Sequence, residues 1–324
     1  MIDYYVFSKG KLISESRDLG FLRVALYEED IQVWVDADQP TPEETKALLE
    51  DVFSFHPLAI EDCTQVSERP KIEQYENYIF MVIHAIDFLQ SQHEFGTTEL
   101  NLFIGKNFLV TYHRDPLRSI TGTKERVLKN AAAIAKAPDR LTYHVLDLLL
   151  DNYEPALADV ASDIAELERD VLTATSMDIM TDIVNLKTQI QKLRLIMGPQ
   201  REVIARLARG EFPIVRTSML PYYRDLLDRL MRFTDMAENH RESLSNTIQL
   251  LLNLQQNRTN QVVKVLTILA TLSTPTLLIT SFYGMNFKTM PELDWNLAHI
   301  WWVFGLAIML TGIIYAVLHK KKYL

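Results

Sequence analysis

Two long runs without a charged side chain dominate the C-terminal part of this sequence. The first extends over the 23 residues from Val265 to Phe287, and the second over the 24 residues from Trp295 to Leu318. About 20 apolar residues cross the hydrocarbon core of a bilayer as a helix. Neither run shows the polar face that a helix of this length carries in a soluble core. The sequence therefore predicts two membrane-spanning helices.

The residues that flank the runs predict the orientation of this helical hairpin. The short link between the runs holds Lys288, Glu292 and Asp294. The basic residues on the other flanks are Arg258, Lys264, Lys320, Lys321 and Lys322. Cytoplasmic flanks carry the excess of Lys and Arg, so we expect both chain ends in the cytoplasm and the link outside a plasma (inner) membrane. Aromatic side chains typical of a membrane interface gather at the outer end: Phe282, Tyr283, Phe287, Trp295, Trp301 and Trp302.

Charge separates the rest of the chain from this tail. The whole chain carries −9, and residues 261–324 carry five lysines against two acids, or +3, which leaves −12 for residues 1–260. An acidic surface argues against nucleic-acid binding. It is compatible with cations as ligands or cargo, although solubility alone also explains it. The single cysteine, Cys63, excludes an intrachain disulfide and a Cys-rich zinc site.

The acidic part mixes two kinds of segment. Strand-like stretches rich in Val, Ile, Phe and Tyr are YYVF (4–7), IQVWVDA (31–37), YIFMVIHAIDF (78–88), ELNLFIG (99–105) and NFLVTYH (107–113). Thr41 and Pro42 before two glutamates predict a helix start. We expect an α/β domain over 1–122 and a helical part over 123–220, with Gly210 as a helix stop. The many acids of the helical part fit a solvated face or a cation site.

Catalytic motifs are scarce. Ser8-Lys9-Gly10-Lys11 lacks the glycine spacing of a P-loop. His56, Glu61, Asp62 and Cys63 could be metal ligands, but His56-Pro57 more simply opens a helix with acids in its first turns. No nucleophile–base arrangement stands out, and we do not expect an enzyme.

One uninterrupted helix leads into the first apolar run. Between Tyr222 and Thr274 there are 53 residues without Gly or Pro, roughly 80 Å of helix. Such a helix needs partners in water. Polar residues recur on it every seventh position: Asn239, Asn246, Asn253, Asn260, Thr267, Thr274 and Ser281. In a membrane this stripe serves either as glue between helices or as the lining of a watery axis, and its asparagine continuation favours the axis.

Two spans per chain are too few to enclose a pore, so we expect a cyclic homo-oligomer. The first span carries the stripe and would lie inside. The second span has only Thr311 and Tyr315 as hydroxyl residues and is expected to face lipid.

Several stretches carry a resemblance to a known family. Tyr283-Gly284-Met285-Asn286 followed by Met290-Pro291-Glu292-Leu293, between two C-terminal spans, resembles the CorA family of divalent-cation channels. HPLAIEDC (56–63), RPKIEQYENYIF (69–80), LFIGKNFLVTYH (102–113) and KVLTILATLSTP (264–275) fit the same family. The resemblance implies a funnel-shaped homopentamer with an α/β cytoplasmic domain. It further implies a stalk helix over 221–283 whose end is the first span (about 264–283), an external loop (284–297), a second span (298–318) and a basic cytoplasmic tail (319–324).

The resemblance also implies cargo and site residues. The family moves Mg²⁺ inward, with Co²⁺ and Ni²⁺ as further cargo, and the Met-Pro-Glu-Leu loop favours a magnesium-type member over the zinc-transporting branch. Gly284, Met285 and Asn286 would form the selectivity filter, with Asn286 meeting the ion through its water. The positions that would line the pore by this resemblance are Asn260, Val263, Leu266, Thr274, Leu277 and Ser281, and the seven-residue stripe adds Thr267. Glu292 and Asp294 would attract cations outside. No organic cofactor is implied.

The resemblance extends only in part to the family's regulatory Mg²⁺ site. In the family, cytoplasmic Mg²⁺ bound between subunits closes the pore, but one carboxylate of that site aligns with Gln249. The alternatives are a Zn²⁺, Co²⁺ or Ni²⁺ transporter of the same fold, and a membrane-anchored sensor or scaffold that does not conduct.

Overall fold

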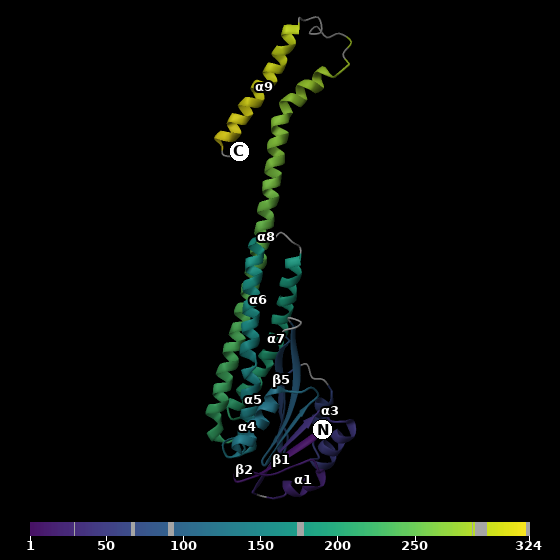
Figure 1. The fold of residues 1–324 in the computed structure, drawn as a ribbon, viewed down its shortest axis with the longest axis vertical. Helices are drawn as coiled ribbons and strands as arrows, with labels where there is room; N and C mark the ends of the chain where they lie inside the picture. The colour runs from purple at the N-terminus through teal and green to yellow at the C-terminus, as the bar shows by residue number, and fades with distance from the viewer. Residues whose placement is uncertain are drawn as a thin grey trace. The chain divides into compact units, whose positions relative to one another are not determined.

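The computed structural model describes residues 1–28, 30–65, 69–89, 94–173, 178–286, 288 and 297–321 (Figure 1). The chain divides into two compact units, Met1–Ile248 and Gln249–Leu324. The described residues of the first unit form one seven-stranded sheet in the order β2-β1-β3-β7-β6-β5-β4. The strands are β1 (Ile2–Ser8), β2 (Lys11–Ser16), β3 (Ile31–Asp38), β4 (Lys71–Gln74), β5 (Tyr78–Leu89), β6 (Glu94–Gly105) and β7 (Phe108–His113).

The strand pairing is mixed. β3 and β7 run parallel, with Trp34 opposite Leu109, and every other neighbouring pair is antiparallel. All five stretches that the composition predicts as strands belong to this sheet. β2 and β4 were not predicted, because β2 (KLISES) is polar and half exposed and β4 has only four residues.

Helices cover both faces of the sheet. The helices among the described residues of both units are α1 (Leu19–Leu26), α2 (Pro42–Lys46), the π-helix η1 (Ala47–Val52), α3 (Pro57–Thr64), α4 (Arg118–Ile134), α5 (Pro138–Asp151), α6 (Tyr153–Thr173), α7 (Asp178–Ala208), the 3₁₀ turn η2 (Thr217–Met219), α8 (Leu220–Tyr283) and α9 (Leu297–Lys320). The helices that cover the sheet all belong to the first unit. One hydrophobic cluster joins the sheet to α1, η1 and α3, and a larger cluster joins its other face to α4–α7 and the start of α8 (Figure 1). The predicted α/β domain is therefore confirmed.

The predicted helix boundaries have the expected local causes. Thr41 caps α2 in a capping box with Glu44. The His56 side chain accepts from the backbone N–H of Leu58 at the start of α3. Gly210 follows α7 with a φ of +73°, a conformation that glycine adopts without a steric cost.

Side chains complete the edge of β5 where β4 no longer covers it. β4 pairs with β5 only as far as Val82. Beyond that point the Gln200 Oε1 accepts from the His84 backbone N–H at 3.1 Å, and the Tyr153 hydroxyl donates to the His84 carbonyl at 2.8 Å. Gln200 Nε2 donates to the same Tyr153 hydroxyl at 3.0 Å. Buried backbone groups require partners, so this trio ties α6 and α7 to the sheet.

The N-terminal part of α8 belongs to the first unit. Its buried apolar residues recur every three or four positions as far as Ala237, and one more follows seven positions later: Tyr223, Leu226, Leu230, Phe233, Ala237 and Leu244. This spacing places one apolar stripe of the helix against α5, α6 and α7. Asn239 and Asn246 belong to the polar residues that recur every seventh position. They lie outside the apolar stripe and are exposed.

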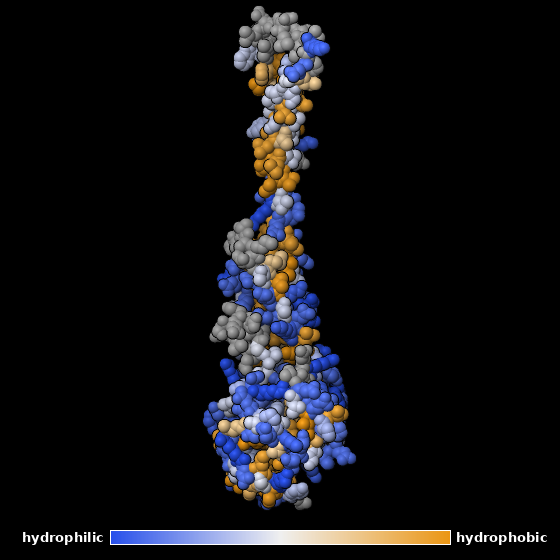
Figure 2. All heavy atoms as spheres, turned by 90° about the vertical axis from the view of Figure 1, so that its right-hand side faces the viewer, coloured by the Kyte–Doolittle hydropathy of each residue, from blue (hydrophilic) through white to orange (hydrophobic). Residues whose placement is uncertain are grey.

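The second unit contains the rest of α8 and α9. Both helices are long and apolar enough to cross a membrane, and almost none of their most apolar windows is buried within the chain. Figure 2 shows hydrophobic residues over these helices, whereas hydrophilic residues predominate on the first unit. A single chain therefore leaves these surfaces for lipid or for other copies.

Candidate pore-lining site

The predicted pore-lining residues lie on one face of α8. At 100° per residue, the positions from Asn260 to Ser281 that were assigned to the pore fall within an arc of about 120°. The three large apolar members are exposed in the single chain, Val263 by 55%, Leu266 by 60% and Leu277 by 65%. No part of the described chain covers this face.

One polar residue of this arc escaped the sequence reasoning. Gln256 is four residues before Asn260, about 40° away around the helix. Its Nε2 donates to the Asn260 Oδ1 at 3.0 Å. Gln256 is not one of the positions spaced by seven residues, so that pattern does not include it. Only the rule that side chains four residues apart on a helix interact could have identified it.

The two threonine hydroxyls of the arc bond to their own helix. Thr267 Oγ1 donates to the Val263 carbonyl at 2.7 Å, and Thr274 Oγ1 donates to the Ala270 carbonyl at 2.8 Å. Such back-bonding satisfies the hydroxyl hydrogen inside an apolar environment. It also fixes which part of each hydroxyl faces away from the helix.

The Gly-Met-Asn signature directly follows the end of α8. The Gly284 N–H donates to the Thr280 carbonyl at 3.0 Å, and the Met285 N–H donates to the Phe282 carbonyl at 3.3 Å. A Cβ on Gly284 would lie 3.1 Å from the Thr280 carbonyl oxygen, which is a tight contact. Glycine therefore lets the chain turn closely over the last helical carbonyls.

Asn286 follows that turn and is exposed. Among the residues that the structure describes, none hydrogen-bonds its side chain, so its amide oxygen is available to a ligand. Glu292 and Asp294 lie outside the described residues.

Salt bridges and hydrogen bonds attach α8 to the helices beside it in the first unit. Arg229 pairs with Asp147 and Asp151 of α5, each at 2.6 Å, and Arg194 of α7 pairs with Glu238 at 2.8 Å. Asp151 is thus one of the acids expected on a solvated face or at a cation site, and here it serves a helix–helix contact.

A second clamp lies at the base of α8. Asp139, 2% exposed, accepts from Arg216 through both carboxylate oxygens, with Nη2 at 2.7 Å and Nε at 2.9 Å from one oxygen each. The Tyr223 hydroxyl donates to the Asp139 carbonyl at 2.7 Å. The start of α5 and the start of α8 are therefore fixed together.

A buried charge cluster lies between the sheet and α4. The Asp36 side chain has no exposed surface; Lys124 Nζ is 2.6 Å from its Oδ2, and His113 Nε2 is 3.2 Å from its Oδ1. Burial alone would raise the pKa of Asp36, but His113 and Lys124 outweigh it and hold that pKa below its ordinary value. Burial alone would lower the pKa of His113, but Asp36 raises it above the ordinary 6.5.

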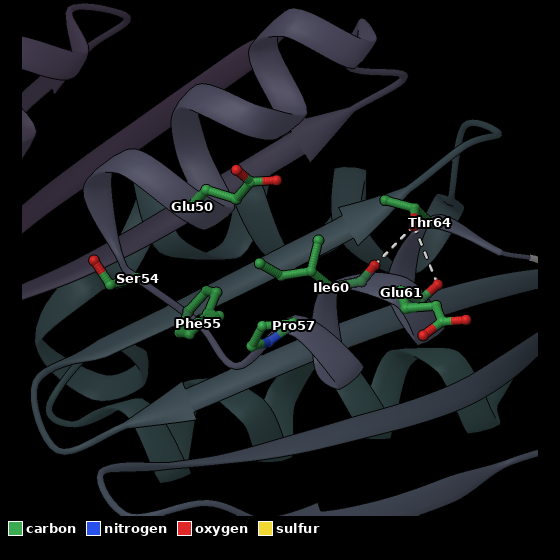
Figure 3. A pocket seen from close by; sticks show the side chains of 7 residues that line it. All are labelled: Glu50, Ser54, Phe55, Pro57, Ile60, Glu61 and Thr64. Atoms are coloured by element: carbon green, nitrogen blue, oxygen red, sulfur yellow. Dashed lines mark hydrogen bonds between the residues drawn. The ribbon is translucent and has the colours of Figure 1, made fainter.

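The residues considered as metal ligands around 56–63 have structural roles. His56 caps α3, Asp62 pairs with Lys71, and Cys63 is completely buried. Beside them is a cavity of about 610 Å³, lined by Glu50, Ser54, Phe55, Pro57, Ile60, Glu61 and Thr64 (Figure 3). The Thr64 hydroxyl donates to backbone carbonyls of its own helix. Among the described residues, no group of three or more His, Cys, Asp or Glu side chains is placed to hold a metal ion.

α9 exposes aromatic and aliphatic side chains. Trp301 is 71% exposed and Trp302 78%, both near the start of the helix. Tyr315 is exposed near its other end. Exposure of these side chains within one chain is what a lipid-facing helix requires.

Comparison with known proteins identifies the family and the fold of this chain. Residues 29–320 match the family described as "CorA-like Mg2+ transporter protein". A putative metal ion transporter of Bacillus subtilis is 32% identical over 89% of this chain and 88% of its own length. A cobalt/magnesium transport protein CorA of Thermotoga maritima is 32% identical over 85% of this chain and 78% of its own.

A solved structure gives the same fold. The complete structure of the CorA magnesium transporter from Methanocaldococcus jannaschii superposes with a TM-score of 0.83, at 23% identity, over 100% of this chain and 99% of that one. The predicted combination of an α/β domain, a long helix and a C-terminal apolar helix is confirmed. The family consists of membrane transporters, in agreement with the expectation that the chain is no enzyme. With its α/β unit, its long helix and a match across residues 29–320, the chain belongs to the CorA-like transporter family.

Proposed function

We propose that five copies of this chain form a channel that conducts hydrated divalent cations, with Mg²⁺ as the preferred cargo, inward down the electrochemical gradient. The observation that carries this proposal is the exposed face of α8, which runs through Asn260, Thr267 and Thr274 and ends at the turn that presents Asn286. The relative from Thermotoga maritima is named for cobalt and magnesium transport, which supports these cations as cargo.

In this proposal the N- and C-termini are cytoplasmic, α8 continues as the stalk into the first span, and 284–297 is the external loop. Lys264 and Lys320 flank the spans on the same side, as the positive-inside rule requires. Glu292 and Asp294 would raise the local cation concentration at the outer mouth.

The neutral side chain of Asn286 suits a hydrated ion. Mg²⁺ gives up its water reluctantly, and conduction requires binding that is favourable yet weak enough for release. Five amide oxygens accept hydrogen bonds from the water shell without removing it. A ring of carboxylates would hold the ion more tightly and slow its exit.

Asn286→Ala and Asn286→Asp test this role in liposomes that contain a Mg²⁺-sensitive dye. We expect the alanine variant to lose selective Mg²⁺ uptake and the aspartate variant to bind Mg²⁺ more tightly but to conduct more slowly. Selective uptake by the alanine variant at the wild-type rate would contradict the proposal.

We further propose that the acidic first unit senses cytoplasmic Mg²⁺. Its charge of −12 over residues 1–260 supports this, although Gln249 provides no carboxylate. Chelation of Mg²⁺ should then increase the rate at which a protease cleaves the wild-type protein, and an unchanged cleavage rate would contradict sensing.

A further inference from the structure

The threonines of the pore-lining arc have already used their only hydroxyl hydrogen. A hydroxyl carries one hydrogen and two lone pairs. The hydrogen of Thr267 is given to the Val263 carbonyl, and that of Thr274 to the Ala270 carbonyl. Each hydroxyl therefore offers only lone pairs to whatever lies beside the helix.

A backbone carbonyl adds another acceptor between these two residues. Pro275 lies inside α8 and has no N–H, so the carbonyl of Thr271 lacks its donor four residues ahead. Thr271 is about 40° from Thr267 around the helix, and its own hydroxyl donates to the Thr267 carbonyl at 2.7 Å. From Thr267 to Thr274, these oxygen atoms accept hydrogen bonds, because the hydrogens of the threonine hydroxyls are committed to the helix.

We infer that Thr267 and Thr274 are specificity-determining residues that favour hydrated cations over hydrated anions. This inference rests on the proposed function, in which this face of α8 lines the pore.

The physical basis is the orientation of the water shell. Waters around a cation direct their oxygens to the ion and their hydrogens outward, and Mg²⁺ keeps several of these waters. Outward hydrogens match a wall of acceptors. Each water around an anion directs one hydrogen inward, so it has only one hydrogen left to donate to the same wall, where a water around a cation has two. Repetition in every copy multiplies the effect around the axis.

Removal of the hydroxyl oxygens tests this inference. The full-length double variants Thr267→Val/Thr274→Val and Thr267→Ala/Thr274→Ala both lose the hydroxyl oxygens. The alanine variant has smaller side chains and is included in case the valine side chains block the pore. In planar bilayers with a MgCl₂ gradient, the reversal potential gives the permeability ratio of Mg²⁺ to Cl⁻. We expect this ratio to fall about tenfold, since each net hydrogen bond is worth about 0.5–1.5 kcal/mol and tenfold corresponds to about 1.4. Thr267→Ser/Thr274→Ser keeps the oxygens and should keep the wild-type ratio.

Thr280→Val is the matched control. Its hydroxyl makes the same kind of bond, to the Thr276 carbonyl at 2.9 Å, but it lies about 120° from Thr274 around the helix. We expect it to leave the ratio unchanged.

The outcomes separate the inference from the proposed function. An unchanged ratio in the valine and alanine variants, while Asn286→Ala loses Mg²⁺ uptake, would overturn the inference alone. An equal fall in Thr280→Val would also overturn it, because the effect would then belong to the helix as a whole. If Asn286→Ala conducts Mg²⁺ like the wild type, the proposed function itself fails.

Discussion

The stability of the first unit depends on the protonation states of two paired side chains, Asp36 and His113. His113 has a raised pKa in the folded chain, so its stabilisation is complete below the ordinary value of 6.5 and is lost as pH rises through the folded pKa. Asp36 has a lowered pKa, so its stabilisation is present above the ordinary value of 3.8 and is lost as pH falls through the folded pKa. The unit should be most stable between these two limits.

We predict that the melting temperature of the full protein in detergent falls as pH rises from 6 to 9, and that His113→Gln removes much of this fall. Circular dichroism at the two pH values measures it. His319→Gln, an exposed histidine at the end of α9, is the control and should retain the wild-type slope. If the melting temperature changed with pH equally in the wild type and in His113→Gln, the pair of Asp36 and His113 would not be the cause of the pH dependence.

Arg216 supports a second prediction for a single residue. Arg216→Met leaves the buried carboxylate of Asp139 without its guanidinium. Loss of one partner of a buried pair costs about 3–5 kcal/mol; because the Arg216 side chain is 48% exposed, we expect about 3 kcal/mol or less. Arg216→Lys should cost less than methionine, since it keeps the charge but loses the two-pronged contact. Urea unfolding of the purified protein measures both, and a fully stable methionine variant would contradict the clamp.

At the scale of elements, the end of α8 depends on Gly284. A methyl group there would lie 3.1 Å from the Thr280 carbonyl oxygen, so Gly284→Ala must shift the turn that carries Asn286. We predict a severalfold lower Mg²⁺ flux in liposomes with little change in melting temperature. Gly312→Ala in α9 has open space around the new methyl group and is the matched control. Equal fluxes for the two variants would contradict a positional role for the turn.

The sequence predicted those elements whose signal is local. The five apolar strand stretches, the helix start at Thr41 and the stop at Gly210 follow from neighbouring residues alone. β2 and β4 were missed because a polar edge strand and a four-residue strand are defined by their partners rather than by their composition.

Contacts distant in the sequence were beyond such reasoning. Arg216 meets Asp139 across 77 residues, and Gln200 reaches His84 across 116. No periodicity within one segment encodes these pairs. For the candidate site, the heptad stripe and the resemblance gave the pore-lining positions as predictions, while the direction of each threonine hydroxyl required coordinates.

At the scale of the whole molecule, one chain leaves the apolar and polar faces of its second unit without cover. Two helices cannot enclose an axis, so the account requires other copies. We predict that light scattering of the detergent-solubilised protein, corrected for bound detergent, gives five times the mass of one chain. A monomer or dimer under conditions that retain Mg²⁺ uptake would contradict the pentamer.

The central claim is that this chain alone makes a path for Mg²⁺, and flux through the purified protein tests it most directly. Liposomes that contain only this protein and a Mg²⁺-sensitive dye are placed in external Mg²⁺ with an inside-negative potential. The account predicts Mg²⁺ entry far above that of protein-free liposomes, faster at more negative potential. Entry no faster than in protein-free liposomes, from folded and inserted protein, would contradict it and favour a sensor or scaffold.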